Sequence, residues 1–267
     1  LPAEPPLLPR TAYPAVDLSE SVEMLAADAL AVLTTVHSAP SAAPPSMERL
    51  GQNYGFVLYE TATPASSAST IEGSGGDSAA ANLTVAFAPY PRDRAHVIVD
   101  GAPATSAPLW RPNGDAPVPL NGGAANVSAA GGQHLQLLIE NMGRLNFGRG
   151  MTDPKGIDGG AGEALVWAGR NTSGGDTPSW RARALPLEYD QLSKLPYSDA
   201  TARGAGASAS DGAFTPTFFR GTLTISGEPQ DTWALDRGLT KGVIWVNGHN
   251  IGRYWAPQGP QHALYVA

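Results

Sequence analysis

The strongest constraint on the fold of this chain is a β-hairpin pattern near its C-terminus. Residues 243–246 form a β-branched and aromatic run, and residues 251–255 form a second apolar run. Between them, Asn247-Gly248 supplies two residues that tolerate positive φ, as a two-residue type I′ turn requires. The pattern therefore predicts two antiparallel strands joined by a tight turn.

A similar pattern occurs earlier, at residues 94–101, where Val-Ile-Val leads into Asp-Gly. The segments that follow also resemble each other, with Gln-His-Leu-Gln-Leu at 133–137 and Gln-His-Ala-Leu-Tyr at 261–265. Such self-similarity predicts two related β domains. The alternative is coincidence, because Asp-Gly and Asn-Gly hairpins are common in all β proteins.

Composition agrees with an all-β fold. The 31 glycines and 24 prolines supply many turns, and the 42% of apolar residues is enough to build cores. A length of 267 residues suits two domains. The net charge of −7 comes without a basic cluster, which argues against a nucleic-acid partner. No apolar run approaches the length of a membrane span.

Several kinds of site are excluded by residue types and spacing. Without cysteine the chain has no disulfide, thiolate zinc site or catalytic thiol. It contains no Gly-x-Ser-x-Gly turn and no phosphate-binding glycine loop. We therefore expect no metal site and no cofactor. The histidines also lack His-x-x-x-His spacing; they are His37, His96, His134, His249 and His262.

Several motifs from about residue 45 to the end resemble, in order and spacing, the C-terminal β domains of family 35 glycoside hydrolases, the β-galactosidases. Motifs in the right order are more specific than any one alone. The matching stretches are residues 47–59, 93–101, 138–148, 153–157, 231–233 and the closing hairpin.

The resemblance implies an all-β chain of two antiparallel β-sandwich domains of the galactose-binding-like jelly-roll type. It also implies an upstream (β/α)8 barrel in the same polypeptide, in which two glutamates cleave terminal β-linked galactose with retention. No position of this chain matches those glutamate motifs, so we assign no catalytic residue here.

The expected organisation has four parts. Residues 1–45 are a linker and a segment connecting to the upstream barrel, with an ambiguous short helix within them. Residues 46–175 form the first sandwich, and residues 176–213 form a connector with a mobile loop. Residues 214–267 form the second sandwich. Because a jelly roll needs a further strand to close, we expect that domain to be truncated. The first residues resemble the middle of a longer polypeptide.

Retaining glycosidases use two carboxyl groups roughly 5 Å apart. Glu140 is the most interesting candidate, because it ends an apolar strand beside Asn141 and Arg144. We favour a structural role, in which Glu140 pairs with Arg144 or accepts backbone N–H bonds. The other candidates are Glu48, Glu60, Asp153, Glu188 and Asp231.

The C-terminal hairpin carries a candidate binding set for galactosides. The alternative, which we favour, is that its tryptophans belong to a core or interface and that Asn247 only serves the turn. The remaining tryptophans, Trp110, Trp167, Trp180 and Trp233, are expected in the core. The candidate set is Trp245, Asn247, Asn250, Arg253, Tyr254 and Trp255.

Three N-glycosylation sequons, at Asn82, Asn126 and Asn171, favour a secreted or vacuolar/lysosomal protein. The function expected from the resemblance is a non-catalytic β-domain region that supports the barrel. A free-standing galactose-binding (lectin-like) or adhesive surface module is the alternative. A degenerate enzyme relative kept for protein–protein contacts is a third.

Overall fold

The computed structural model is almost entirely β, with antiparallel sheets, which confirms the predicted fold class. It divides into a larger unit, Glu23–Pro196 with Ala205–Thr217, and a smaller unit, Leu1–Val22 with Tyr197–Gly204 and Phe218–Ala267. None of the described helices is long and apolar enough to cross a membrane. The structure describes residues 8–63, 81–87, 91–105, 109–110, 124–129, 132–144, 146–148, 151, 153–157, 165–168, 179–200, 216–236, 238–259 and 261–267.

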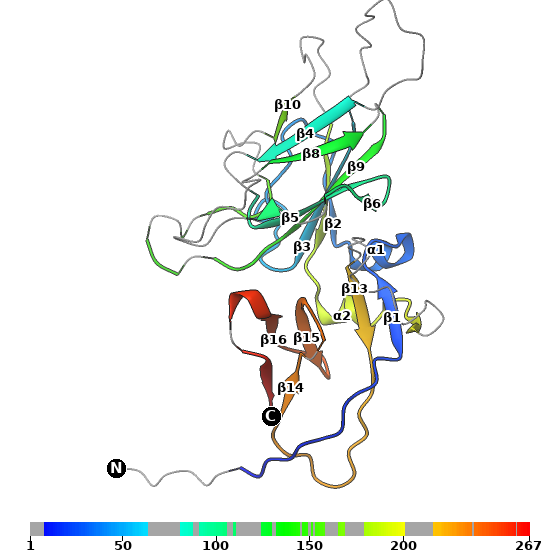
Figure 1. Ribbon diagram of the computed structural model, residues 1–267, viewed down its shortest axis with the longest axis vertical. Helices are drawn as coiled ribbons and strands as arrows, with labels where there is room; N and C mark the ends of the chain where they lie inside the picture. Colours follow the sequence, from blue (N-terminus) through cyan, green and yellow to red (C-terminus); the bar gives the residue numbers. More distant parts are fainter. Residues whose placement is uncertain are drawn as a thin grey trace, which may run out of the picture. The chain divides into compact units, whose positions relative to one another are not determined.

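The larger unit is built on a seven-stranded sheet in the order β2-β11-β3-β9-β5-β6, in which β7 also pairs with β5 (Figure 1). Every neighbouring pair is antiparallel. The strands are β2 (Val36–His37), β3 (Phe56–Ala62), β5 (Arg94–Val99), β6 (Ala102–Pro103), β7 (Leu109–Trp110), β9 (His134–Glu140) and β11 (Arg181–Leu185).

The core of the larger unit lies on this sheet. In β9 all residues after His134 are buried, so its two faces are both covered. Such a strand is a near-continuous apolar run instead of an alternating one. Alternate residues of β3, β5 and β9 supply most of the core cluster, among them Val57, Tyr59, Val97, Leu135, Leu137 and Ile139.

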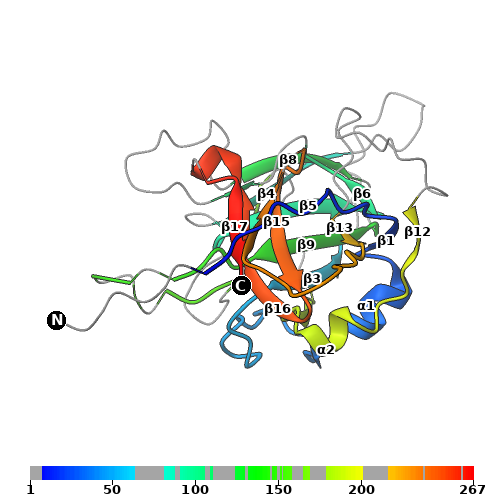
Figure 2. The ribbon, with the colours of Figure 1, turned by 90° about the horizontal axis from the view of Figure 1, so that it is seen from below.

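A three-stranded sheet forms a second layer of this unit, in the order β10-β4-β8. Its strands are β4 (Ala81–Phe87), β8 (Ala124–Ala129) and β10 (Leu165–Ala168). Figure 1 and Figure 2, which differ by a quarter turn, both show it lying over the seven-stranded sheet. Two antiparallel sheets stacked in this way make a β-sandwich.

The segment before residue 45 is more structured than a linker. It contains α1 (Ala27–Leu33), in which Leu30 and Leu33 are buried, and β2 at the edge of the sheet. A second short helix, α2 (Tyr189–Leu192), lies against α1, because Gln191 Nε2 donates to Leu33 O at 2.7 Å. These contacts make residues 27–37 part of the larger unit.

The segment 176–213, expected as a connector, supplies an internal strand of the sheet. β11 lies between β2 and β3. Its Arg-Ala-Arg-Ala alternation puts Ala182 and Ala184 in the core, at 1% and 0% exposure. Alanine leaves little apolar signal, so the alternation is weak in the sequence although the strand is buried.

The smaller unit contains the predicted C-terminal hairpin, formed by β15 (Lys241–Val246) and β16 (His249–Trp255). Asn247 and Gly248 have φ values of 49° and 89°, as the turn requires. The earlier hairpin is also present, with φ values of 48° and 79° at Asp100 and Gly101. The turn chemistry therefore predicted both hairpins correctly.

The remaining strands limit the internal similarity. β17 (Ala263–Val266) and β9 contain the two similar segments that follow the hairpins, but they pair differently. β17 pairs with β14 (Thr232–Leu235), whereas β9 pairs with β5, the first strand of its own hairpin. The short 3-10 helix η5 (Ala256–Gln258) precedes β17. A three-stranded sheet, mostly in the smaller unit, consists of β12 (Ser198–Asp199), β1 (Glu20–Glu23) and β13 (Thr217–Arg220).

Candidate functional site

The most highly charged site of the larger unit surrounds a buried lysine. Lys155 is 2% exposed, and its Nζ lies 2.7 Å from Asp93 Oδ1 and 2.9 Å from Asp93 Oδ2. Asp153 Oδ2 lies 3.5 Å from the same nitrogen, and the other oxygen of Asp153, Oδ1, lies 2.7 Å from Arg92 Nη1. Lys155 therefore bridges two carboxylates, as the high cost of a buried charge requires.

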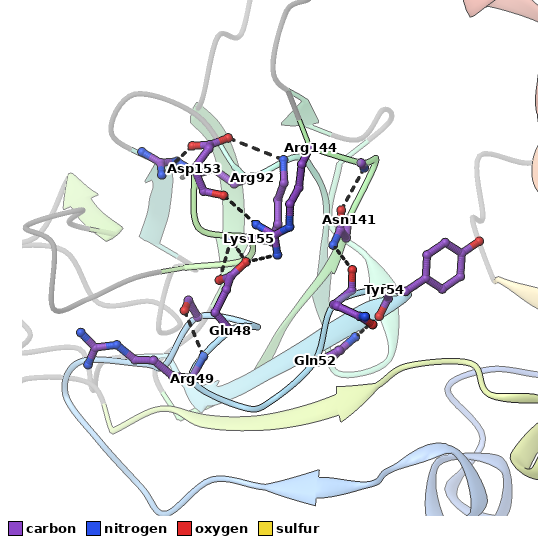
Figure 3. Close-up of polar contacts among 12 residues, drawn as sticks. Glu48, Arg49, Gln52, Tyr54, Arg92, Asn141, Arg144, Asp153 and Lys155 are labelled. Carbon is purple, nitrogen blue, oxygen red and sulfur yellow. Dashed lines mark hydrogen bonds and ion pairs between the residues drawn. The ribbon is translucent and has the colours of Figure 1, made fainter. Parts of the chain in front are cut away.

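Glu48 completes this cluster from the turn before β3. Both of its oxygens accept from the backbone N–H of Lys155, at 3.1 and 3.0 Å, and Oε1 also pairs with Arg144. Figure 3 shows Glu48, Arg144, Asp153 and Lys155 converging. Burial raises the pKa of Glu48, but hydrogen bonds from Arg144, from backbone N–H groups and from Ser46 outweigh it and hold the pKa below its usual value.

The cluster fixes the base of the segment that follows β9. Asp93 Oδ2 accepts from the N–H of Met142 at 2.8 Å. Asn141 Nδ2 donates to Asn53 O at 3.0 Å, and Arg144 Nη1 donates to Asp153 O at 3.1 Å. The start of the segment 141–157 is thereby tied to Asn53 and Asp93, and at its end the N–H of Ile157 donates to Oη of Tyr59 in β3 at 3.0 Å.

Apolar side chains are exposed between those two ends. Phe147 is 87% exposed and Met151 is 51% exposed. A large aromatic side chain held in water by an anchored loop suits contact with another surface.

The chemistry open to this cluster is limited by its own lysine. A retaining glycosidase needs two carboxyl groups that face a sugar between them. Here the ammonium group of Lys155 contacts both Asp93 and Asp153. The two carboxylates therefore serve as counter-ions to a buried cation, which is a structural role.

Glu140 is structural as well, but its partner differs from the predicted one. It lies opposite Arg94 across the β5–β9 pair, with Arg94 Nη1 3.6 Å from Glu140 Oε2. The predicted partner, Arg144, contacts Glu48 instead. Burial lowers the pKa of Arg94, against the raising effect of Glu140. Arg94 Nη1 also lies 2.8 Å from Nε2 of the buried His96.

The other carboxyl candidates are also engaged within the protein. Glu60 accepts from Arg183 Nε at 2.5 Å on the neighbouring strand. Glu188 forms the capping box of α2. Asp231 accepts from Tyr265 Oη at 2.6 Å. The three contacts are a cross-strand ion pair, a helix cap and a side-chain hydrogen bond, and each of them stabilises the fold.

The hairpin register divides the predicted sugar-binding set. Trp245 lies opposite Asn250, Val243 opposite Arg253 and Lys241 opposite Trp255, so Trp245, Asn250, Arg253 and Trp255 share one face. Tyr254 lies opposite Gly242, on the other face, and Asn247 lies in the turn. The two tryptophans are half-buried, and Lys241 Nζ lies 5.1 Å from the ring centre of Trp255.

The predicted core tryptophans have different outcomes. Trp180 is 2% exposed, which confirms its prediction, whereas Trp233 is 43% exposed, so its prediction was wrong. Trp233 lies on the outward face of β14, next to Tyr265. The side chains of Trp110 and Trp167 are outside the described part of the chain.

Two of the three sequons fall on described strands. Asn82 is in β4 and Asn126 is in β8, while Asn171 lies outside the described residues.

Comparison with known families matches two successive parts of the chain to two different domains. Residues 44–161, within the larger unit, match the family model for the first all-beta domain of β-galactosidase. Residues 216–267 match the model for the galactose-binding domain of β-galactosidase. The chain belongs to the C-terminal domain region of the β-galactosidases. The predicted resemblance is thereby confirmed.

Curated β-galactosidases align over nearly the whole chain. The protein from Felis catus is 32% identical over 277 residues, covering 98% of this chain and 36% of that protein. The Homo sapiens protein is 31% identical over 278 residues, covering 98% and 35%. The Xanthomonas manihotis protein is 32% identical over 268 residues, covering 98% and 36%. The chain thus spans about a third of the length of these β-galactosidases.

The β-galactosidase matches place the two sites in different domains. The Lys155 cluster lies in the first all-beta domain, and the hairpin set lies in the galactose-binding domain. Sequence reasoning included Asp93 and Lys155 in the family motifs but gave them no role. The signal that could have found Asp93 is a charged residue directly before the buried strand β5, since such a residue needs a partner. Lys155 adjoins no strand of the described residues, so the sequence carries no comparable signal for it.

Proposed function

We propose that this chain is the non-catalytic C-terminal β-domain region of a β-galactosidase-like glycoside hydrolase. It supports a catalytic barrel in the same polypeptide, and that barrel removes terminal β-linked galactose. We propose the same four parts as above: a connecting segment at 1–45, a first sandwich at 46–175, a connector at 176–213 and a second sandwich at 214–267. Residues 27–37 and β11 pack into the first sandwich.

The observation that carries the non-catalytic role is the engagement of the candidate carboxyl groups. Asp93 and Asp153 share Lys155, and Glu140 contacts Arg94. Both carboxyl groups of a retaining glycosidase must face the substrate. Carboxylates that face a cation of their own protein instead do not offer that access.

The supporting role rests on the anchored loop. Phe147 is exposed at 87%, while the base of its loop is held by the buried Lys155. A rigid base lowers the entropy cost of presenting an aromatic anchor to another surface. The surface that this geometry suits is apolar and belongs to the upstream barrel.

The first test is hydrolysis of an aryl β-galactoside by the purified 267-residue chain. We expect no turnover above a buffer blank. Turnover that disappears in the Glu140→Gln or Asp153→Asn variant would overturn the proposal. Turnover that survives both changes would indicate a contaminating hydrolase, and repurification should then remove it.

The second test uses the complete polypeptide that contains this chain and a barrel. Phe147→Ala should lower galactoside hydrolysis or the melting temperature of the barrel. Tyr189→Ala is the matched control, because Tyr189 is an aromatic residue of the same unit with 48% exposure. Equal effects of the two substitutions, or no effect of either, would contradict a supporting contact through Phe147.

Galactose binding by the hairpin is the second candidate function. Trp245, Asn250, Arg253 and Trp255 share a face, an arrangement in which an aromatic ring lies beside amide and guanidinium donors. Titration with galactose, followed by calorimetry, tests it. A saturable signal lost in Trp255→Ala but kept in Trp233→Ala would favour the lectin-like function. Absence of a signal would reject it.

The proposed location is a secreted or vacuolar/lysosomal compartment. The support is the presence of three sequons, at Asn82, Asn126 and Asn171.

A further inference from the structure

The segment 8–22, expected from the sequence as a linker, is bound by the smaller unit. It belongs to that unit together with Tyr197–Gly204 and Phe218–Ala267. β1, at the end of the segment, lies between β12 and β13 (Figure 2). Ser21 and Val22 are 3% and 2% exposed. This part of the chain is therefore built into a sheet instead of being a free connection.

The end of the segment is held by main-chain pairing. Ser21 lies opposite Ser198 in β12, and the N–H of Ala200 donates to Ser19 O at 2.8 Å. β1 is the middle strand of its sheet, so β12 and β13 have no direct pairing in the described sheet order. Pairing of this kind is how a sheet binds an added extended peptide.

An ion pair fixes the same end of the segment to β13. Both carboxylate oxygens of Glu20 accept from Arg220, Oε2 from Nε and Oε1 from Nη2, each at 2.7 Å. The guanidinium of Arg220 also lies 4.2 Å from the ring centre of Tyr197. An exposed ion pair contributes little stability by itself, but a bidentate one fixes a geometry. The pair therefore sets where β1 lies along β13.

Backbone packs against backbone at Gly221, the residue that follows β13. A Cβ added there would overlap the backbone oxygen of Asp17 and would lie 2.7 Å from Cγ1 of Val16. A backbone atom cannot rotate away as a side chain can, so any side chain at this position displaces the segment. Gly221 thus offers a way to loosen the segment without changing its own residues.

The beginning of the segment is held at a second place, beside β14. Arg10 forms a parallel bridge with Asp231, and the N–H of Thr11 donates to Asp231 O at 3.0 Å. The N–H of Gln230 donates to Oη of Tyr13 at 2.9 Å. The segment is thus fixed near both of its ends on one unit, so it lacks the conformational freedom of a flexible linker.

We propose that residues 8–22 are a strap by which the smaller unit holds the barrel of the proposed function. A linker that is free over its whole length lets the two parts that it joins separate widely. A bound strap leaves a shorter free connection, which raises the effective concentration of the barrel at the β domains. The inference rests on the proposed function, because it needs a barrel upstream of residue 8.

Hydrogen exchange in the 267-residue chain tests the strap itself. The amide protons of Thr11, Ala200 and Gln230 all form hydrogen bonds between the strap and the rest of the smaller unit. Each should exchange at least about tenfold more slowly than in the unfolded chain. Exchange of all three at the rate of the unfolded chain would overturn the proposal.

Gly221→Ala should release the strap. The same three protons should then exchange at least about tenfold faster, while the β9 amide protons of the larger unit keep their protection. Gly259→Ala is the matched control, because Gly259 lies in the same unit, has a φ of −179° and has nothing within 4 Å of an added Cβ. Equal exchange rates in the two variants would overturn the proposal.

Arg220→Ala is a milder variant that decides the case in which Gly221→Ala unfolds the whole smaller unit. It removes the partner of Glu20 and leaves the close backbone approach intact. The Ala200 proton, which is bonded to the strap, should then exchange faster than before, while the β15 amide protons keep their rates. Equal acceleration at Ala200 and in β15 would overturn a separable strap.

The link to the barrel has its own test in the complete polypeptide. The temperature at which galactoside hydrolysis is lost should be about 2–4 °C lower in Gly221→Ala than in Gly259→Ala. A released strap with unchanged heat resistance of the barrel would overturn the proposal. A native polypeptide without galactoside hydrolysis would contradict the proposed function instead, and the exchange rates would still decide whether the strap exists.

Discussion

Lys155 Nζ lies 2.7 Å from Asp93 Oδ1, and both residues are buried, at 2% and 6% exposure. The two are 62 positions apart in the sequence. Removal of one member of such a pair leaves an uncompensated charge in a poorly solvated place, which costs more than the pair itself contributes.

Lys155→Met should therefore destabilise the larger unit by about 3–5 kcal/mol. Hydrogen exchange of the β9 amide protons measures the opening free energy of this unit separately from the other. Lys194→Ala, at an exposed lysine of the same unit, should change it by less than about 0.5 kcal/mol. Equal effects of the two variants would contradict a buried role for Lys155.

Glu48 predicts a pH dependence of stability. Its pKa is lowered in the folded protein, so its stabilising effect is present above the ordinary value of 4.5 and is lost as pH falls through the folded pKa. The melting-temperature difference between the native protein and Glu48→Gln should be larger at pH 7 than at pH 3. The exposed Glu228→Gln is the control. A melting-temperature difference that grows as the pH falls would contradict a lowered pKa of Glu48 in the folded protein.

Gly156 is expected to tolerate no side chain. Its φ is +84°, and an added Cβ would lie 2.3 Å from Oη of Tyr59, which accepts from the N–H of Ile157. Gly51 has φ +71° with nothing within 4 Å of such a Cβ. Gly51→Ala should cost about 1–2 kcal/mol through backbone conformation alone.

Gly156→Ala should cost an additional amount of about 1–3 kcal/mol for the steric overlap. The difference is measured by unfolding the Gly51→Ala and Gly156→Ala variants in urea, with hydrogen exchange of the β3 amide protons as the readout. Equal losses would mean that Tyr59 moves aside without cost.

Asn247 tests the hairpin turn of the smaller unit. A β-branched residue at its φ of 49° is strongly disfavoured. Asn247→Val should lower the stability of the β15–β16 pair by about 1–2 kcal/mol, whereas Asn247→Gly should be close to neutral. Amide exchange in β15 measures both. Val and Gly variants with the same protection would contradict a turn of this type.

Local turn chemistry explains what the sequence predicted well. Positive φ at Asp100 and Asn247 follows from the Asp-Gly and Asn-Gly pairs alone. β3 and β9 follow from dense apolar runs at residues 56–62 and 134–140. These signals are contained in a few consecutive residues, so no knowledge of the fold is needed.

Partners from distant segments explain what could not be predicted. Glu140 was paired with its neighbour in sequence, Arg144, but the strand register brings Arg94 opposite it. Only the register of β5 with β9 could decide between them. Trp233 was assigned to a core by residue type, although its strand position faces outward. Which face of a lone strand is covered depends on elements elsewhere in the chain.

The place of β11 has a consequence for synthesis of the protein. This strand is encoded after β2, β3, β5 and β9, yet it lies between β2 and β3. While the part of the nascent chain that can fold ends at β9, the side of β3 that later pairs with β11 is still open. An open strand side of this kind invites wrong partners until the missing strand arrives. Delays in translation between residues 140 and 181 should thus favour aggregation or chaperone capture.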